Sequence, residues 1–214
     1  KQKGSEGPVQ WRRAMYTIYA TTRLPGPPWP GFARVRLWRF CNTIGGFMCF
    51  RVTIIMPSNS KINSVREISR QHGFYFDRID NPYVLNQLSE NEIYLGDAQN
   101  GCECYTGIGA YELYIRDINK ALDTLDNEWL REKMKEEENE RKKKYESEVN
   151  KWLVLLKILI NDFSFSRIGI LLHFYHNSSQ NEEISIKDKI YNKLDQIDSE
   201  FLMKIEKDII YYFC

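Results

Sequence analysis

The sequence predicts an α+β protein: one small, mostly antiparallel sheet with helices on one side and a long charged helix or helical hairpin that protrudes. Three observations support this fold class. Short β-branched and aromatic runs are separated by polar turns, which is typical of antiparallel strands. Apolar residues at helical spacing follow several of these runs. Finally, the 59 residues from 110 to 168 contain neither Gly nor Pro, which indicates long helices.

The composition changes abruptly at Gly45-Gly46-Phe47-Met48. Residues 1–47 hold 8 basic residues, 1 acidic residue and five of the seven prolines, whereas residues 48–214 hold 22 basic and 28 acidic residues. The Gly-Gly-Phe-Met segment can be encoded as a bacterial ribosome-binding site followed by a start codon. We therefore expect the native protein to begin at Met48, and residues 1–47 to be a leader or non-native segment that packs poorly. Residues 48–214 have the size of a single domain.

The first part of this domain is predicted to alternate strands and short helices. Residues 50–56 are a β-branched apolar run stopped by Pro57, which predicts a buried strand. Apolar positions then recur every three residues from Ile62, and the helix that they predict ends at His72-Gly73. The segments that follow are predicted to be a strand at 74–79, a turn at 80–82, a short helix at 83–88 and a strand at 92–95.

A helical arm is predicted at about 111–161. Apolar residues follow helical spacing near both ends, and the stretch 133–144 between them is almost entirely charged, with Glu and Lys or Arg four residues apart. Such a stretch is typical of a solvent-exposed helix whose amphipathic ends pack on a body. The alternative is a two-helix hairpin that turns near Asn139. In either form we expect the arm to bind a protein partner or a second copy of the chain.

The C-terminal part is predicted to add two strands and a helix. Residues 167–175 form the clearest strand of the chain, and 184–186 alternates as a strand that pairs back with it in a hairpin. Asp198 or Ser199 caps a last helix, which carries Ile209 on its apolar face. The predicted sheet therefore has four or five strands.

Charge, hydropathy and cysteine content exclude several functional classes. Residues 48–214 are net acidic, so we expect no nucleic-acid binding by this domain. The longest apolar stretch, 152–160, is nine residues and contains Lys157, whereas a helix needs about 20 apolar residues to cross a bilayer. The five cysteines form no paired framework of a secreted scaffold. We therefore expect a cytoplasmic protein without a membrane span.

Cys49 is the candidate catalytic residue. If Met48 is the initiator and is removed, Cys49 becomes N-terminal, and its α-amino group, with a pKa near 7.7–8.0, can act as the base that activates the thiol. A Met-Cys start followed by a buried strand resembles the class II glutamine amidotransferases. This resemblance implies that Arg51 assists the nucleophile and that Asn100 and Gly101 help to form the oxyanion hole. The alternative is that Cys49 is an apolar strand residue.

Cys102 and Cys104 are the candidate metal ligands. In an extended segment they point to the same face and would supply half of a tetrahedral zinc site. We also expect them to converge with Cys49 in one pocket on the sheet. Zinc is the one cofactor that these residues would suit, and no other cofactor is predicted. Gly107 and Gly109 are expected to serve a tight turn rather than a phosphate cradle, because no Lys-Ser or Lys-Thr follows them.

Two histidines near the end of the strand at 167–175 have the H-x-x-H spacing of a metal-binding pair. His173 and His176 stand three residues apart, so on a strand they face opposite sides and cannot share a metal. Because His173 lies inside an apolar run, we predict that it is a hydrogen-bonded core residue.

Four motifs together resemble those of a family of small bacterial proteins to which no activity is assigned. They are a Met-Cys start, an early Asn-Pro, a Gly-Cys-x-Cys-x-Thr core and a late Leu-Leu-His-aromatic-Tyr strand. In this sequence they fall at Met48-Cys49, Asn81-Pro82, 101–106 and 171–175. The resemblance implies that the native chain starts at Met48 and that the domain extends over 48–214.

These observations leave three hypotheses for the function. The first is a non-catalytic protein-interaction or regulatory domain that binds through its helical arm. The second is an N-terminal-cysteine amidohydrolase or amidotransferase-like enzyme built on Cys49. The third is a zinc- or thiol-dependent domain built on Cys102 and Cys104. Proximity of Cys49 to His173 or to the other cysteines would favour chemistry, and an exposed apolar surface on the arm would favour binding.

Overall fold

The structure is a computed structural model that describes residues 49–59, 61–97, 106–176 and 178–214. These residues all belong to one compact unit, Cys41–Cys214. The segment 1–47 lies outside the described residues, so its expected poor packing stays a prediction. The same holds for the start at Met48.

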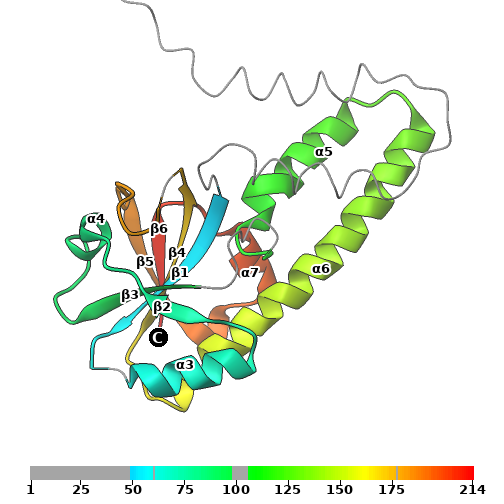
Figure 1. Ribbon diagram of the computed structural model, residues 1–214. Helices are drawn as coiled ribbons and strands as arrows, with labels where there is room; N and C mark the ends of the chain where they lie inside the picture. The colour runs from blue at the N-terminus through cyan, green and yellow to red at the C-terminus, as the bar shows by residue number, and fades with distance from the viewer. Residues whose placement is uncertain (1–48, 60, 98–105, 177) are drawn as a thin grey trace, which may run out of the picture. The chain divides into compact units, whose positions relative to one another are not determined.

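A six-stranded sheet forms the centre of this unit (Figure 1). The strand order is β2-β3-β1-β4-β6-β5, and all neighbours are antiparallel except β5 and β6, which run parallel. The sheet and its helices confirm the predicted α+β class. The strands are β1 (Cys49–Pro57), β2 (Phe76–Arg78), β3 (Glu92–Asp97), β4 (Ile168–Tyr175), β5 (Asp188–Asn192) and β6 (Ile209–Phe213).

Residue alternation along the central strands gives the sheet a core on each face. In β1, Val52, Ile54 and Met56 are buried on one face and Ile55 on the other, and none of them is more than 1% exposed. The neighbouring strand β4 is buried along most of its length. Burial on both faces explains why 50–56 and 167–175 read as continuous apolar runs rather than as alternating ones.

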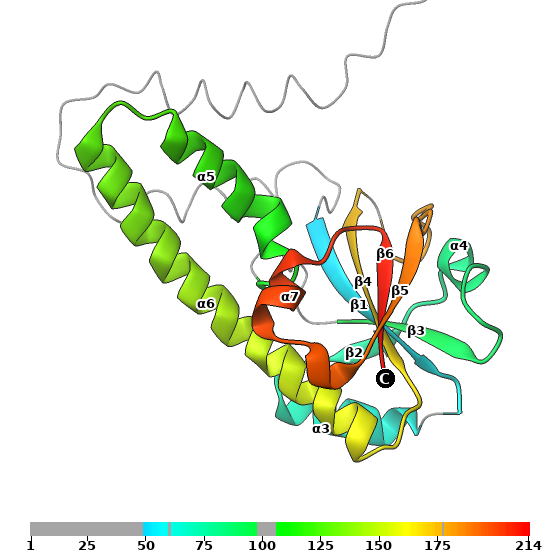
Figure 2. The same cartoon turned by 180° about the vertical axis from the view of Figure 1, so that it is seen from behind.

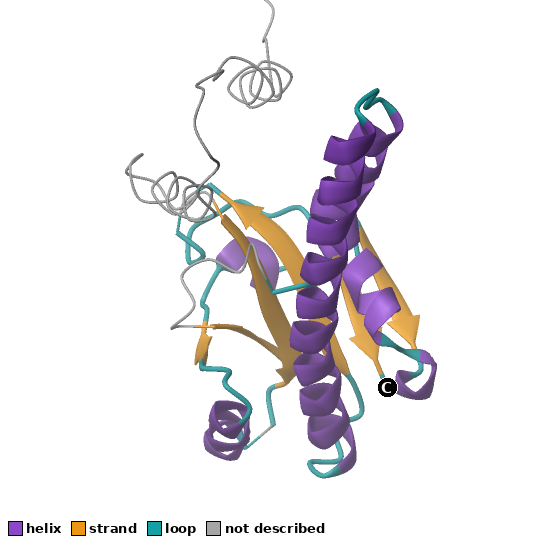
Figure 3. Cartoon of the chain, turned by 90° about the vertical axis from the view of Figure 1, so that its right-hand side faces the viewer, coloured by secondary structure: helices purple, strands orange, loops and turns teal. Residues whose placement is uncertain are grey.

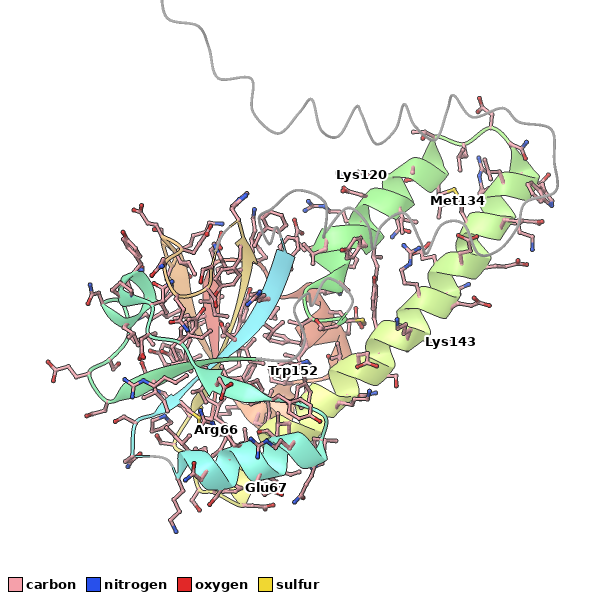
Figure 4. The ribbon with its side chains drawn as sticks, in the orientation of Figure 1. Arg66, Glu67, Lys120, Met134, Lys143 and Trp152 are labelled. Carbon is pink, nitrogen blue, oxygen red and sulfur yellow. The ribbon has the colours of Figure 1, made fainter. Side chains whose placement is uncertain are left out.

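Three helices cover the first face: α3 (Ile62–Gln71), α6 (Glu128–Asn161) and α7 (Ser199–Lys204), as Figure 2 shows. Trp152 of α6 lies at the centre of this core and extends towards β2 (Figure 4). Its ring packs against Phe74 and Phe76, with centroid separations of 4.4 and 5.9 Å. Burying an aromatic side chain of this size is among the largest single contributions to a core. The C-terminal half of α6 is therefore part of the core.

The opposite face carries the short helix α4 (Pro82–Leu85) and the segment 178–187. The longer helices thus lie on one side, as predicted, and one short helix lies on the other. Asn81 joins the two. Its buried side-chain oxygen accepts hydrogen bonds from the first backbone N–H groups of α4. Its amide nitrogen donates to the carbonyls of Ser179 and Glu182 at 2.9 and 2.8 Å. The Asn-Pro pair thus caps a helix and fixes a distant loop.

The arm is a helical hairpin. It begins with the π-helical segment η1 (Tyr111–Ile115), continues as α5 (Arg116–Asp123) and returns as α6 after a turn at 124–127. Figures 1 and 2 show α5 and the N-terminal half of α6 side by side, extending beyond the sheet. Apart from the turn, the helix predicted over 111–161 is confirmed.

The arm turns at 124–127 and not near Asn139, where the alternative prediction of a two-helix hairpin set the reversal. Asn139 lies inside α6, and 133–144 is helical throughout. The chain turns at 124–127 because Asn127 is the N-cap of α6, where its side chain accepts a hydrogen bond from the backbone N–H of Leu130 at 3.0 Å. An Asn directly before a Glu in the first turn is a helix-start signal, and the lack of Gly and Pro obscured it.

The predicted strand at 184–186 is wrong. The side chain of Gln87 donates to the carbonyl of Ile184 at 2.6 Å and accepts from the backbone N–H of Ile186 at 2.9 Å. These backbone groups therefore pair with a side chain and not with β4. Ile184 is nevertheless buried against the sheet, which explains the alternating pattern.

The last helix is also shorter than predicted. Asp198 caps α7 as expected, accepting a hydrogen bond from the backbone N–H of Phe201 at 2.8 Å. The helix ends at Lys204, however, and Ile209 begins β6 instead of continuing the apolar face. The reason is tertiary: β6 pairs with both β4 and β5, so its backbone groups find partners across the sheet.

Candidate functional site

The arm leaves one side of α6 uncovered by the rest of the described chain, and this side faces the viewer in Figure 3. All seven buried residues of α6 lie between 145 and 159, in the half that packs on the sheet. Residues 128–144, all of which the structure describes, include no buried side chain. With 34 residues, α6 is about 50 Å long at 1.5 Å per residue. Roughly half of that length projects past the core.

Eight exposed residues form a line along α6, which we call the outer stripe. Their spacing is three or four residues throughout, so they share one helix face. The spacing repeats after 11 residues, which is close to a whole number of helical turns, so the line runs nearly straight along the axis. The members are Trp129, Glu132, Glu136, Glu140, Lys143, Ser147, Lys151 and Val154, and all are exposed.

The outer stripe is apolar at its ends and charged in its middle. The side chain of Trp129 is 63% exposed and that of Val154 is 45% exposed. Between them, three acidic residues are followed by Lys143 and Lys151. Large exposed apolar side chains set in a polar surface are a common mark of protein-interaction sites.

The inner side of α6 holds the arm together. The ring of Tyr145 stacks with that of Tyr114 of η1, at a centroid separation of 6.3 Å. Nearer the turn, the guanidinium of Arg131 donates to the carbonyl of Leu125, and Met134 lies on the side of α6 that faces α5 (Figure 4). These contacts hold the two helices in one arrangement, so the outer stripe is presented on a preformed surface.

A glycine turn anchors the base of the arm. Gly107 and Gly109 have positive φ angles of +80° and +63°, which confirms the predicted tight turn. Gly107 lies against α6, where an added Cβ would stand 2.6 Å from the carbonyl oxygen of Tyr145. The backbone N–H of Gly109 donates to the carbonyl of Leu202 in α7 at 2.9 Å. The turn therefore joins the start of the arm to α6 and α7.

A second polar cluster lies on the opposite face of the sheet, around His173. The Nδ1 atom of His173 is 2.6 Å from a carboxylate oxygen of Asp208, and Lys187 donates to the other oxygen at 2.9 Å. Burial raises the pKa of Asp208, but the hydrogen bonds from His173 and Lys187 outweigh it and hold this pKa below its ordinary value. The bonded, mostly buried imidazole agrees with the predicted core role of His173.

Arg51 and Cys49 lie on the strand next to this histidine. The β1–β4 register sets Arg51 opposite His173 and the backbone of Cys49 opposite Tyr175. The Arg51 guanidinium stands 5.8 Å from the centre of the Tyr175 ring. Within the described residues, the buried Nε of Arg51 and the buried Nε2 of His173 both have no hydrogen-bond partner. The hydroxyl of Tyr175 is 2.5 Å from that of Tyr94.

The other predicted site residues lie outside the described residues. Asn100, Gly101, Cys102 and Cys104 all belong to 98–105. The oxyanion pair, the zinc pair and the convergence of three cysteines therefore stay predictions. In the part of the chain that the structure describes, no three His, Cys, Asp or Glu residues gather as a metal site.

The side chains of His173, in β4, and of His176, directly after it, lie on opposite sides of the sheet, as predicted. The ring of His173 meets that of Tyr175 at 4.7 Å, on the face that carries α4, whereas the ring of His176 meets that of Phe174 at 4.9 Å. Phe174 in turn packs against Phe50, a partly buried residue that contacts the core on the α6 side of the sheet.

A buried charged network around Glu92 has no signal in the sequence. Glu92 accepts a hydrogen bond from Nε of Arg167 at 3.0 Å and another from the hydroxyl of Tyr212 at 3.0 Å, and the Nη2 atom of Arg167 lies 2.8 Å from the same carboxylate as an ion pair. Burial and the charge of Glu92 together raise the pKa of Tyr212 above its ordinary value. Ser89 adds a backbone N–H to the same carboxylate. The Glu92 oxygens are thus well supplied with donors, which indicates a structural role rather than a reactive one.

Comparison with known proteins adds no assignment: no protein-family model, curated protein or solved structure matches the chain. None of the helices in the described ranges has both the length and the apolar character needed to cross a membrane. The outer stripe and the cluster around His173 are therefore the features that indicate a function.

Proposed function

We propose that this protein is a protein-binding domain in which the sheet and its helices hold the arm, and the outer stripe is the binding surface. The observation that carries the proposal is the outer stripe itself: eight exposed residues on one face of α6, with Trp129 and Val154 at its two ends. Tryptophan is the residue type most enriched among energetic hot spots of interfaces.

The build of the arm supports this proposal. The glycine turn and the contacts between η1, α5 and α6 fix the helix before any partner binds. A preformed surface loses little conformational entropy on association, so more of the contact energy appears as affinity. A 34-residue helix of which only the C-terminal half is buried also offers more surface than the core requires.

Photo-crosslinking tests the proposal. A photoreactive phenylalanine analogue would replace Trp129 or Val154 in cells of the organism that makes the protein. Lys135, which is exposed on α6 but lies off the outer stripe, serves as the control position. We expect the same crosslinked protein from both stripe positions and none from Lys135. With that protein purified, Trp129→Ala should weaken binding at least tenfold, whereas Tyr83→Ala, which removes an exposed aromatic ring from α4, should not. Equal crosslinking from all three positions would refute the proposal.

A second candidate, a cysteine-dependent enzyme that uses Cys49, is favoured by one observation. The β1–β4 register sets the residues at 49 and 51 beside the strand that carries His173, and Asp208 holds the His173 ring by its Nδ1 atom. A carboxylate that fixes the tautomer of an imidazole is the usual way to prepare a histidine as a general base.

Alkylation kinetics test this candidate. In a variant that starts at Met48 and keeps Cys49 as its only cysteine, iodoacetamide should react at least ten times more slowly after His173→Gln. His176→Gln is the matched control: His176 follows β4 directly and its ring lies on the other side of the sheet, so this substitution should leave the rate unchanged. Equal rates in all three proteins would eliminate His173 as the base.

A further inference from the structure

We propose that the protein bound by the outer stripe is a second copy of this chain, with the two α6 helices antiparallel. This inference rests on the proposed function and specifies the partner. It predicts a symmetric dimer in which each outer stripe covers the other.

The spacing of the outer stripe is the first argument. Its steps of 3, 4, 4, 3, 4, 4 and 3 residues are the same in both directions along the helix. A two-fold axis between residues 141 and 142 therefore places every member of the stripe opposite another member. Two-fold symmetric interfaces require such self-complementary surfaces.

Charge complementarity is the second argument. This axis sets Glu140 opposite Lys143 of the second copy and Glu132 opposite its Lys151, and each pair occurs twice in the dimer. The remaining members meet as Trp129 with Val154 and Glu136 with Ser147. No like charges face each other along the stripe. The exposed Trp129 of each copy therefore packs against the exposed Val154 of the other.

Three other alignments of the same two stripes bring like charges together. In a parallel pair in register, Glu132, Glu136 and Glu140 would each face their own copies. An antiparallel pair shifted by 11 residues would set Glu132 against Glu140, or Lys143 against Lys151. Like charges across an interface disfavour the arrangement that creates them. Charge thus favours this antiparallel register over each of these alignments.

Access to the stripe is the third argument. α5, η1 and the sheet all contact α6 on its inner side, so no described element lies over the outer stripe (Figure 3). Lys151 already pairs with Glu148 of its own helix at 3.0 Å, and Glu136 pairs with Lys133 at 2.6 Å. Exposed pairs of this kind contribute little and exchange easily, so they do not prevent contacts with a partner.

Sedimentation velocity over a range of protein concentrations tests the inference on the full chain. We expect a reversible monomer–dimer equilibrium that weakens as salt screens the charges. Glu140→Lys and Lys143→Glu should each weaken the dimer at least tenfold, because each change creates two like-charge contacts. The double variant with both changes should restore dimerisation to within about threefold of the original. Lys142→Glu, the same charge change one residue off the stripe, should have little effect.

The orientation is tested by disulfide crosslinking between variants. A mixture of Trp129→Cys and Val154→Cys proteins should form a mixed dimer, beyond the background of the original chain. Trp129→Cys alone should not, because the two copies of residue 129 would lie about 38 Å apart in the antiparallel dimer. Circular dichroism and thermal unfolding verify that each variant is folded.

Each outcome separates this inference from the proposed function. A protein that stays monomeric at all concentrations, but crosslinks to a different protein from positions 129 and 154, overturns the second copy and leaves the proposed function standing. A monomer without stripe-dependent crosslinks overturns both. A dimer that persists in both single charge reversals, or that is not restored in the double variant, means that the chain associates through another surface and overturns the inference.

Discussion

At the residue scale, Asp208 combines an unusual backbone with an unusual electrostatic setting. Its φ angle is +66°, its backbone N–H donates to the carbonyl of Leu172 at 2.8 Å, and its carboxylate holds His173 and Lys187. Asparagine tolerates the same backbone conformation as aspartate. Asp208→Asn therefore removes the charge without adding backbone strain.

We expect Asp208→Asn to lower the free energy of unfolding by about 1.5 kcal/mol at pH 7, because hydrogen bonds to a charged group are lost. The folded-state pKa of Asp208 is lowered, so its stabilising effect is present above the unfolded-state pKa of about 3.9 and is lost as pH falls through the folded-state pKa. Urea unfolding at pH 7, 5 and 3 measures this: the difference between the two proteins should persist at pH 5 and shrink at pH 3. A difference that is constant across this range would contradict the assigned role.

The cluster around His173 also shows which site residues a single sequence can indicate. His173 could be predicted as a bonded core residue because it lies in an apolar run. Asp208 could not, because nothing in the residues around it marks it as a partner. The two meet only through the pairing of β4 with β6 and the positive φ at Asp208, which are long-range and tertiary. The same reason hid Glu92, Arg167 and Tyr212.

At the element scale, the glycine turn at 107–109 determines how the arm begins. Gly107→Ala would introduce a Cβ 2.6 Å from the carbonyl oxygen of Tyr145, a backbone atom that cannot move aside, at a φ of +80°. We expect this variant to lose at least about 2 kcal/mol of stability in urea unfolding. Gly73→Ala is the matched control, since Gly73 has a φ of +84° but no atom within 4 Å of the added Cβ. Gly73→Ala should lose only about 1 kcal/mol, the cost of placing a residue with a Cβ at a positive φ. Equal losses would show that the contact with α6 is unimportant.

The turn at 124–127 gives a second prediction at this scale. Asn127→Ala removes the hydrogen bond to the N–H of Leu130 and should cost about 1 kcal/mol of stability, the usual value for a lost N-cap. Asn139→Ala lies at an exposed position inside α6 and should be neutral or slightly stabilising, because alanine has the higher helix propensity. Thermal unfolding followed by circular dichroism compares the two. The reverse ranking would place the hairpin turn near 139.

The elements differ in how well the sequence predicts them, and burial explains the difference. The strands at 50–56 and 167–175 are buried on both faces, so their apolar runs are unambiguous. The strand β6 follows α7 after a short gap, and Phe201, Leu202, Ile205 and Ile209 fit helical spacing, so the local pattern favoured a longer helix. Pairing with β4 and β5 overrides that preference.

At the scale of the whole molecule, the two cores and the arm divide the described chain into parts of unequal stability. Side chains of β1 and β4 are buried on both faces of the sheet, and α6 between 145 and 159 contributes seven buried residues. The rest of α6 projects beyond this core with its side chains at least partly exposed. Regions with few buried apolar contacts open locally at a lower free energy than the global unfolding of the protein.

Hydrogen exchange followed by mass spectrometry should reveal this division. At protein concentrations where the chain is monomeric, we expect amides in 128–144 to exchange at least ten times faster than those in 145–159, although both belong to one continuous helix. Raising the protein concentration should slow exchange in 128–144 if the outer stripe binds a second copy, because a partner stabilises the bound conformation by mass action. Lys143→Glu should remove that added protection and leave the exchange of 145–159 unchanged, since the core does not depend on the dimer. Uniform exchange along α6 at low concentration would show instead that the arm is as stable as the core, and that its contacts with α5 and η1 suffice to hold it without a partner.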